Sequence, residues 1–229
     1  METIQILDLG GSIVAPDNID TTFIKEFKKF LVEWLEADSS RKAILIIGGG
    51  GAARKYQTAY REIDDNPTHD DQDWIGIAAT RLNGQLLKGV FKDYCKDDVI
   101  INPETDGEFK GRVMIAAGWK PGFSTDYDSV VLAKRFSAKR VLSLSNIAKI
   151  YTDDPNTNPE AKPVDNMSWD EYKLLCGDEW TPGKNIPFDP VATKLAAELG
   201  LKVIAAAGKD LNNLKKIFNE EEFFGTTIS

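Results

Sequence analysis

The 229-residue sequence predicts an α/β protein, a three-layer α/β/α sandwich with a mainly parallel central sheet. Segments with the periodicity of strands and of helices alternate along the chain, which is the pattern of α/β folds. Most of the predicted strands are apolar over their whole length, as at 43–47 (AILII) and 113–117 (VMIAA). Such strands are typical of parallel sheets, because helices cover both faces and neither side of the strand meets water.

The first half of the chain is predicted to form four strands and four helices. The stretch 3–9 (TIQILDL) is a strand that runs into the glycines at positions 10 and 11. Large apolar residues recur at helical spacing over about 20–37 and predict an amphipathic helix there. The other predicted elements are strands at 43–47, 99–101 and 113–117, helices at 52–62, 74–90 and around 129–133, and a polar loop at 64–73.

The second half carries clear helix boundaries. Ser168 and Glu171 have the spacing of a capping box and predict a short helix that ends near residue 176. Asp189 and Pro190 are an N-cap and first-turn pair, which predicts a helix as far as about residue 199. The remaining predicted elements are a strand at 140–144, a long polar loop at 145–163, a strand at 202–207, a helix that starts at Asp210 and a final strand at 226–228.

The composition excludes several classes of protein. Hydrophobic residues make up 42% of the chain, which is enough for one large domain or two tightly joined lobes. A net charge of −8 argues against broad binding to nucleic acid or to an anionic membrane. Cys95 and Cys176 are far apart and form no C-x-x-C motif, and no apolar run is long enough to span a membrane. Together with the absence of a signal-peptide pattern, this predicts a reduced, cytoplasmic protein.

Glycine-rich or polar loops follow four of the predicted strands, at 10–12, 48–51, 118–126 and from 145 onward. In a parallel sheet these loops meet at the carboxyl edge, where ligands bind. Glycine lets the backbone approach a ligand closely, and the N-terminus of a helix offers free N–H groups to an anion. Several such turns at one edge predict a ligand with several phosphates. For the 118–126 turn taken alone, the simpler interpretation is that Ser124, Thr125 and Asp126 cap the next helix.

Two familiar phosphate-binding motifs do not account for these loops. The P-loop pattern G-x-x-x-x-G-K-[ST] is absent from the sequence. The dinucleotide pattern G-x-G-x-x-A occurs at Gly48, Gly50 and Ala53, but the acidic residues at 70–73 precede a predicted helix instead of ending a strand. A ribose-binding acid should end the next strand, so a nicotinamide cofactor is a minor alternative.

Six motifs, in this order, resemble the amino-acid-kinase family and, within it, the UMP kinases of archaeal type. The resemblance covers nearly the whole chain. The motifs are LGGS at 9–12, GGG at 48–50 with Ala53-Arg54, DWIGIAATRLN at 73–83, PGFSTD at 121–126, YTDDP at 151–155 with Asn158-Pro159, and DPVA at 189–192 with Lys194.

The resemblance implies that the protein phosphorylates UMP to UDP with ATP and Mg²⁺, and it assigns roles to residues. The implied catalytic residues are Asp189, Lys194 and Asp8. The implied ATP-binding residues are Gly10, Gly11, Gly50, Arg54, Ser145, Tyr151 and Asp154. The implied UMP-binding residues are Gly49, Asp73, Gly118, Trp119, Lys120, Pro121, Gly122, Phe123, Ser124 and Thr125. No metal ligand is assigned.

The resemblance also implies an organisation. The chain would be a single amino-acid-kinase-like domain over 1–229, with a UMP lobe at about 1–135 and an ATP lobe at about 136–229. A homo-oligomer, specifically a hexamer, is implied as well. Taken singly, four of the assigned residues have structural alternatives. Arg54 is also explained as a solvated helix residue, Asp73 and Asp189 as helix caps, and Tyr151 as a core residue with its hydroxyl exposed.

One position departs from the family pattern. Most members carry a lysine two residues before the first glycine turn, and this chain has Asp8 there. An anion beside ATP should oppose catalysis. Three explanations are open: Asp8 binds Mg²⁺ while another lysine such as Lys194 acts, Asp8 pairs with a lysine, for which Lys194 is a candidate, and has no direct role, or the protein binds nucleotide without rapid turnover. Two rival functions are open. One is a kinase of the same fold with another small phosphate or carboxylate acceptor, and the other, motivated by Asp8, is a non-catalytic nucleotide-binding regulator.

Overall fold

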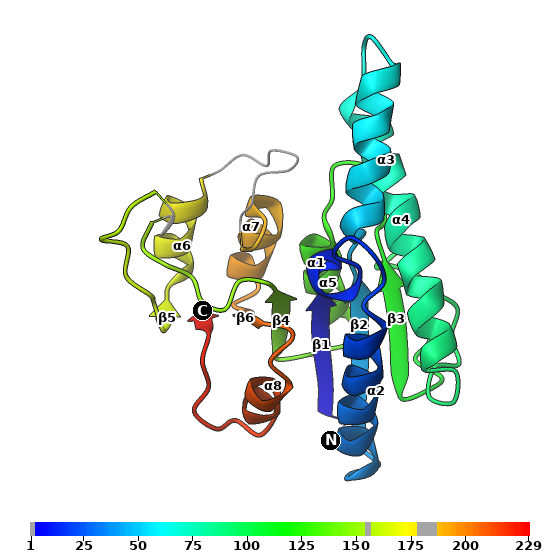
Figure 1. The fold of residues 1–229 in the computed structure, drawn as a ribbon. Coiled ribbons are helices and arrows are strands. Elements are labelled where there is room, and N and C mark those ends of the chain that lie inside the picture. The colour runs from blue at the N-terminus through cyan, green and yellow to red at the C-terminus, as the bar shows by residue number, and fades with distance from the viewer. Residues whose placement is uncertain (1–2, 154–156, 178–186) are drawn as a thin grey trace.

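A computed structural model describes residues 3–153, 157–177 and 187–229 of the chain and contains one seven-stranded sheet (Figure 1). The strand order is β3-β2-β1-β4-β6-β7-β5, and every pair is parallel except β6 with β7. The strands are β1 (Thr3–Leu9), β2 (Arg41–Ile47), β3 (Val113–Ala117), β4 (Arg140–Ser145), β5 (Asn166–Met167), β6 (Lys202–Ala207) and β7 (Thr226–Ile228). The predicted α/β fold with a mainly parallel sheet is confirmed.

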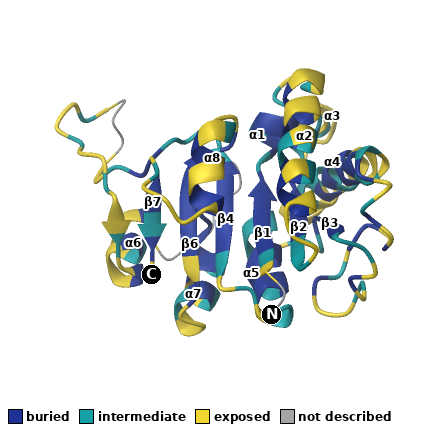
Figure 2. Ribbon diagram, turned by 90° about the horizontal axis from the view of Figure 1, so that it is seen from below, coloured by how far each residue is buried: buried dark blue, intermediate teal, exposed yellow. Residues whose placement is uncertain are grey.

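Helices cover both faces of the sheet and bury its strands (Figure 2). Alternate residues of a strand point to opposite faces. Leu7 and Leu9 therefore join the core under α2 and α8, whereas Ile6 joins the core under α5, α6 and α7. The helices are α1 (Gly11–Val14), α2 (Thr21–Glu36), α3 (Gly50–Ile63), α4 (His69–Val90), α5 (Thr125–Arg135), α6 (Trp169–Cys176), α7 (Pro190–Glu198) and α8 (Leu211–Phe218).

The helices α3 and α4 form an antiparallel pair whose far end projects beyond the carboxyl edge of the sheet (Figure 1). The sequence places α4 from residue 74, but the helix begins at His69, because Thr68 is its N-cap and accepts from the Asp71 amide at 3.1 Å. The strand predicted at 99–101 is wrong, since only an isolated bridge joins Ile100 to Ala116. The short elements α1 and β5 were not predicted.

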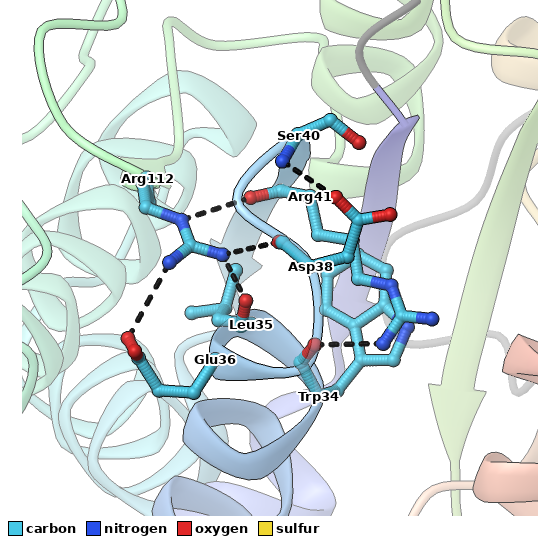
Figure 3. Close-up of polar contacts among 7 residues, drawn as sticks. All are labelled: Trp34, Leu35, Glu36, Asp38, Ser40, Arg41 and Arg112. Atoms are coloured by element: carbon cyan, nitrogen blue, oxygen red, sulfur yellow. Dashed lines mark hydrogen bonds and ion pairs between the residues drawn. The ribbon is translucent and has the colours of Figure 1, made fainter.

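Arg112 connects the end of α2 with the amino ends of β2 and β3 through several hydrogen bonds (Figure 3). Its guanidinium donates to the carbonyl oxygens of Leu35, in the last turn of α2, of Asp38, just after that helix, and of Arg41, at the start of β2. Arg41 in turn donates to the carbonyl of Trp34 at 2.9 Å. These bonds hold the amino ends of β2 and β3 in register, and they thereby help to fix the strands from which the loops at the carboxyl edge begin. No described helix has the length and apolarity needed to cross a membrane.

Candidate functional site

Two glycine turns meet at the carboxyl edge of β1 and β2. A Cβ on Gly11 would lie 2.0 Å from the backbone nitrogen of Gly50, and Gly50 has a positive φ of 66°. Only glycine at both positions allows this approach, because a Cβ would overlap backbone that cannot move independently. Asn83 of α4 donates to the carbonyls of Gly48 and Gly49 at 2.9 and 3.2 Å and so fixes the second turn.

The loop at 118–125 ends at the start of α5. Ser124 is the N-cap of this helix, and its Oγ accepts from the Tyr127 amide at 3.2 Å, so the capping interpretation is confirmed. Among the described residues, the amides of Ser124, Thr125 and Asp126 have no hydrogen-bond acceptor. Three free N–H groups at the positive end of a helix attract an anion. Capping and anion binding are therefore compatible here.

Asp73 contacts this loop. Its Oδ2 accepts from the amide of Gly122 at 2.8 Å, so α4 and the 118–125 loop meet at the two places where UMP-binding residues are predicted. The alternative in which Asp73 caps α4 is wrong, because Thr68 is the N-cap. The half-buried carboxylate of Asp73 lies within reach of a ligand seated on the loop.

Asp189 joins the start of α7 to the start of α5. Its Oδ1 accepts from the amides of Val191 and Ala192 at 2.6 and 2.9 Å, which confirms it as the N-cap of α7. Its Oδ2 accepts from the Ser124 hydroxyl, and its own amide donates to Asp126 Oδ2 at 2.9 Å. The Asp189 side chain is thus both a cap and a member of the site.

The hydroxyl group of Tyr172 holds the backbone of Phe188, the residue before Asp189. The Tyr172 hydroxyl donates to the Phe188 carbonyl and accepts from the Phe188 amide, each at 2.7 Å. Burial raises the pKa of Tyr172 well above its usual range, so the phenol keeps its proton and its donor role. The residue that leads into Asp189 is therefore fixed on both of its backbone polar groups.

Asp8 lies in a cluster of acids rather than beside a cation. Its side chain is 4% exposed, and its Oδ1 has no partner among the described residues. Burial raises the pKa of Asp8 to about 6; the side chains of Asp126 and Thr125 oppose this, and the Asp189 carboxylate adds to it. Burial, and next the Asp8 charge, raise the pKa of Asp126 well above its usual range. One or both of these carboxyl groups therefore carry a proton near neutral pH.

The hypothesis that Lys194 pairs with Asp8 is wrong for the described structure. Lys194 is exposed on α7 and lines a hollow of about 480 Å³ between α6 and α7, together with Trp169 and Lys173. Lys194 lies five residues after Asp189, which advances it about 140° around the helix and away from the face that meets α5. A catalytic role for Lys194 stays a prediction that this placement does not support.

The residues predicted to bind ATP lie in several places. Gly10 is beside Ser145, since a Cβ on Gly10 would lie 3.6 Å from Ser145 Cβ. Arg54 is exposed and donates to the Pro16 carbonyl at 2.5 Å, which favours its structural interpretation. Tyr151 lies on the loop after β4, where it bridges Pro163. Asp154 lies outside the described residues. Within the described part of the chain, no group of three acidic, histidine or cysteine side chains could hold a metal ion.

Five residues of the site were given no catalytic or ligand-binding role from the sequence, although all but Asp128 lie in the motifs at 73–83 and 121–126: Thr80, Arg81, Asn83, Asp126 and Asp128. The polar residues of α4 among them have a recognisable signal. Thr80 and Asn83 lie on the same face as the buried Ile77 and Leu87, and a buried polar residue on an apolar helix face usually has a specific partner. Asp126 was interpreted only as a cap of the next helix, and Asp128 carries no signal, because acids are common in the first turns of helices.

Comparisons with known proteins were made for the whole chain. A model of the amino acid kinase family matches residues 3–206. A uridylate kinase of Methanocorpusculum labreanum is 30% identical over 97% of this chain and 94% of its own length, and one of Thermoplasma volcanium is 31% identical over 97% and 96%. The crystal structure of uridylate kinase from Archaeoglobus fulgidus superposes with a TM-score of 0.83 at 27% identity, covering 99% of this chain and all of the other.

Proposed function

The chain belongs to the amino acid kinase family, and from this membership we propose that it transfers the γ-phosphoryl group of ATP to UMP, giving ADP and UDP. Its relatives are named uridylate kinases, and these names support UMP as the acceptor. The single observation that carries the proposal is the bond between Asp73 and the 118–125 loop, because it joins a carboxylate suited to a ribose hydroxyl with amides suited to a phosphate.

The two substrates would occupy different halves of the sheet edge. UMP would bind over about 1–135, where Asp73 and the 118–125 loop lie, and ATP over about 136–229. The glycine turns lie between the halves, and Gly10 adjoins Ser145 of β4. ATP phosphates placed along these turns would face the phosphate of UMP across the N-terminus of α5.

Phosphoryl transfer requires positioning and charge stabilisation more than covalent chemistry. The free amides of Ser124, Thr125 and Asp126 would bind the acceptor phosphate, and the glycine turns would admit the phosphates of ATP at close range. Mg²⁺ supplies positive charge to the transferring group, and ATP phosphates would carry it, since the described residues offer no three-ligand metal group. A proton on Asp126 would limit repulsion between the acids of the site and the phosphates.

We expect the substitution Asp73→Asn to raise KM for UMP about tenfold or more, while KM for ATP changes less than twofold. A hydrogen bond to a charged group contributes about 1.5–3 kcal/mol, and an amide replaces that charge. Asparagine can still accept from the Gly122 amide, so the loop should keep its position. Initial rates at varied UMP and varied ATP measure both constants. Equal increases in the two KM values would refute the assignment of Asp73 to UMP.

An exposed apolar stripe on α4 supports assembly of the chain with copies of itself. Trp74, Leu82 and Leu86 are 48%, 69% and 39% exposed and recur at multiples of four residues along one side of the helix. Large exposed apolar patches usually mark interfaces. We propose a cytoplasmic homo-oligomer, with a hexamer as the expected size. Light scattering that finds only monomer at micromolar concentration would contradict it.

A further inference from the structure

The first turn of the 118–125 loop is held by side chains rather than by its own backbone. Thr80 Oγ1 accepts from the Gly118 amide at 2.8 Å, and Asp128 Oδ2 accepts from the Trp119 amide at 3.2 Å. The carbonyls of Gly118 and Trp119 accept from Arg81, at 3.3 Å from Nε and 2.8 Å from Nη2. Three side chains thus satisfy all four backbone polar groups of the turn. Thr80 and Arg81 belong to α4, and Asp128 to α5.

Asp128 is buried among groups that disfavour its charge. Its side chain is 1% exposed, and its Oδ1 has no hydrogen-bond partner among the described residues. The charged groups that face it are Asp8 of β1, Asp189 of α7 and Arg81 of α4. Two of these are carboxylates, and the guanidinium of Arg81 donates to loop carbonyls instead. A buried carboxyl group that has no cationic partner keeps its proton to a higher pH than an exposed one.

The direction of the titration follows from this environment. Burial is the main cause that raises the pKa of Asp128 to about 8; Asp8 and Asp189 act in the same direction, and the Trp119 amide and Arg81 oppose them. The side chain is therefore mostly uncharged at pH 7 and ionises as the pH rises through 8. The second ionisation of a phosphate monoester lies near pH 6, so the UMP phosphate does not titrate in the same range.

We propose that Asp128 is a positioning residue for the acceptor, which holds the Trp119 amide as an uncharged carboxylic acid. The inference rests on the proposed function, in which the 118–125 loop receives the UMP phosphate. Asp128 is the fourth residue of α5, and an ionised carboxylate there would place a negative charge near the amides that bind the phosphate. The neutral acid keeps the bond to Trp119 without that charge. The position of the 118–125 loop and the binding of the acceptor therefore both depend on whether the Asp128 carboxyl group is protonated.

The protonation state can be followed in the ligand-free protein. Labelling with ¹⁵N-tryptophan gives backbone signals for only five residues, and the variant Trp119→Phe identifies the signal of Trp119. This signal should shift between pH 6.5 and 9.5 with a midpoint near 8, and the shift should vanish in Asp128→Asn. The same shift in the Asn variant, or no shift in the unmodified protein, would overturn the proposal. Circular dichroism checks that the variant is folded.

A comparison of two variants tests the positioning role. Asparagine at position 128 can accept from the Trp119 amide, and alanine cannot. Calorimetry at pH 7 should find that Asp128→Ala binds UMP at least tenfold more weakly than Asp128→Asn, while their affinities for ATP agree within twofold. Equal affinities for UMP would refute the role. If the unmodified protein does not bind UMP, the proposed function fails, whereas the titration of the Trp119 signal still reports on Asp128.

Discussion

Replacing Asp189 with alanine is expected to lower kcat for UDP formation by at least about 100-fold, because small misplacements of reacting groups have effects of that size. Asp189 caps α7 with its Oδ1, accepts from the Ser124 hydroxyl with its Oδ2 and donates from its amide to Asp126. Alanine removes both side-chain contacts at once. The start of α7 then loses its side-chain bond to Ser124 and keeps only the backbone bond to Asp126, so the acceptor phosphate and the donor are no longer held firmly in line.

The same substitution should reduce the free energy of unfolding by about 1 kcal/mol, the usual value of an N-cap. Asp210 provides a matched control, because it caps α8 through a 2.9 Å bond from the Asn213 amide and does not belong to the site. Asp210→Ala should cause a similar loss of stability and change kcat less than twofold. If both variants lose activity in proportion to their stability, Asp189 has no role beyond capping.

Gly11→Ala is expected to lower the free energy of unfolding by roughly 3 kcal/mol or more, at the upper end for overpacking. The new Cβ would lie 2.0 Å from the nitrogen and 2.4 Å from the Cα of Gly50. Both atoms belong to backbone, so the two glycine turns must separate to make room. Because the same turns are proposed to admit the phosphates of ATP, the folded fraction should also bind ATP poorly. Urea unfolding and calorimetry with an ATP analogue measure the two effects.

Gly89→Ala is the control for this substitution and has the opposite expected sign. Gly89 lies in the last turn of α4, is exposed, and has open space around the position of a Cβ. Alanine there should stabilise the protein by about 0.5–1 kcal/mol, since glycine in a helix has the larger conformational entropy when unfolded. Similar stabilities of the two variants would show that the turns do not pack as tightly as Gly11 and Gly50 indicate.

Local signals in the sequence are enough to predict most of the fold. The capping residues Ser168, Asp189 and Asp210 start helices where they were expected, because a cap depends only on its own first turn. Apolar runs likewise mark the buried strands. The start of α4 was placed too late, since its first turn is polar and exposed and lacks the apolar periodicity that marks a helix. The stretch at 99–101 has strand composition but meets β3 only at one bridge.

The functional roles of site residues could be predicted from the sequence only for residues in ligand-suited loops or at recognised motif positions. Asp73 and the 118–125 loop were assigned together and lie in contact. Arg81 and Asp128, which fix the same loop, lie inside helices, and their partners are 38 and 9 residues away in sequence. Such contacts depend on how α4 and α5 pack on the sheet. The alternative in which Asp8 pairs with Lys194 is wrong for the same reason, because helix phase decides which way a residue of α7 faces.

The most direct test is a measurement of ADP and nucleoside diphosphate formed from ATP and Mg²⁺ with a panel of acceptors. The panel contains UMP, CMP, AMP and small carboxylates such as aspartate and glutamate. The proposed function predicts that UDP forms and that kcat/KM for UMP exceeds the value for every other acceptor at least tenfold. Turnover with a different acceptor would place the chain elsewhere in its family. Binding of ATP without production of ADP with any acceptor would contradict the proposed kinase activity and favour a nucleotide-binding regulator.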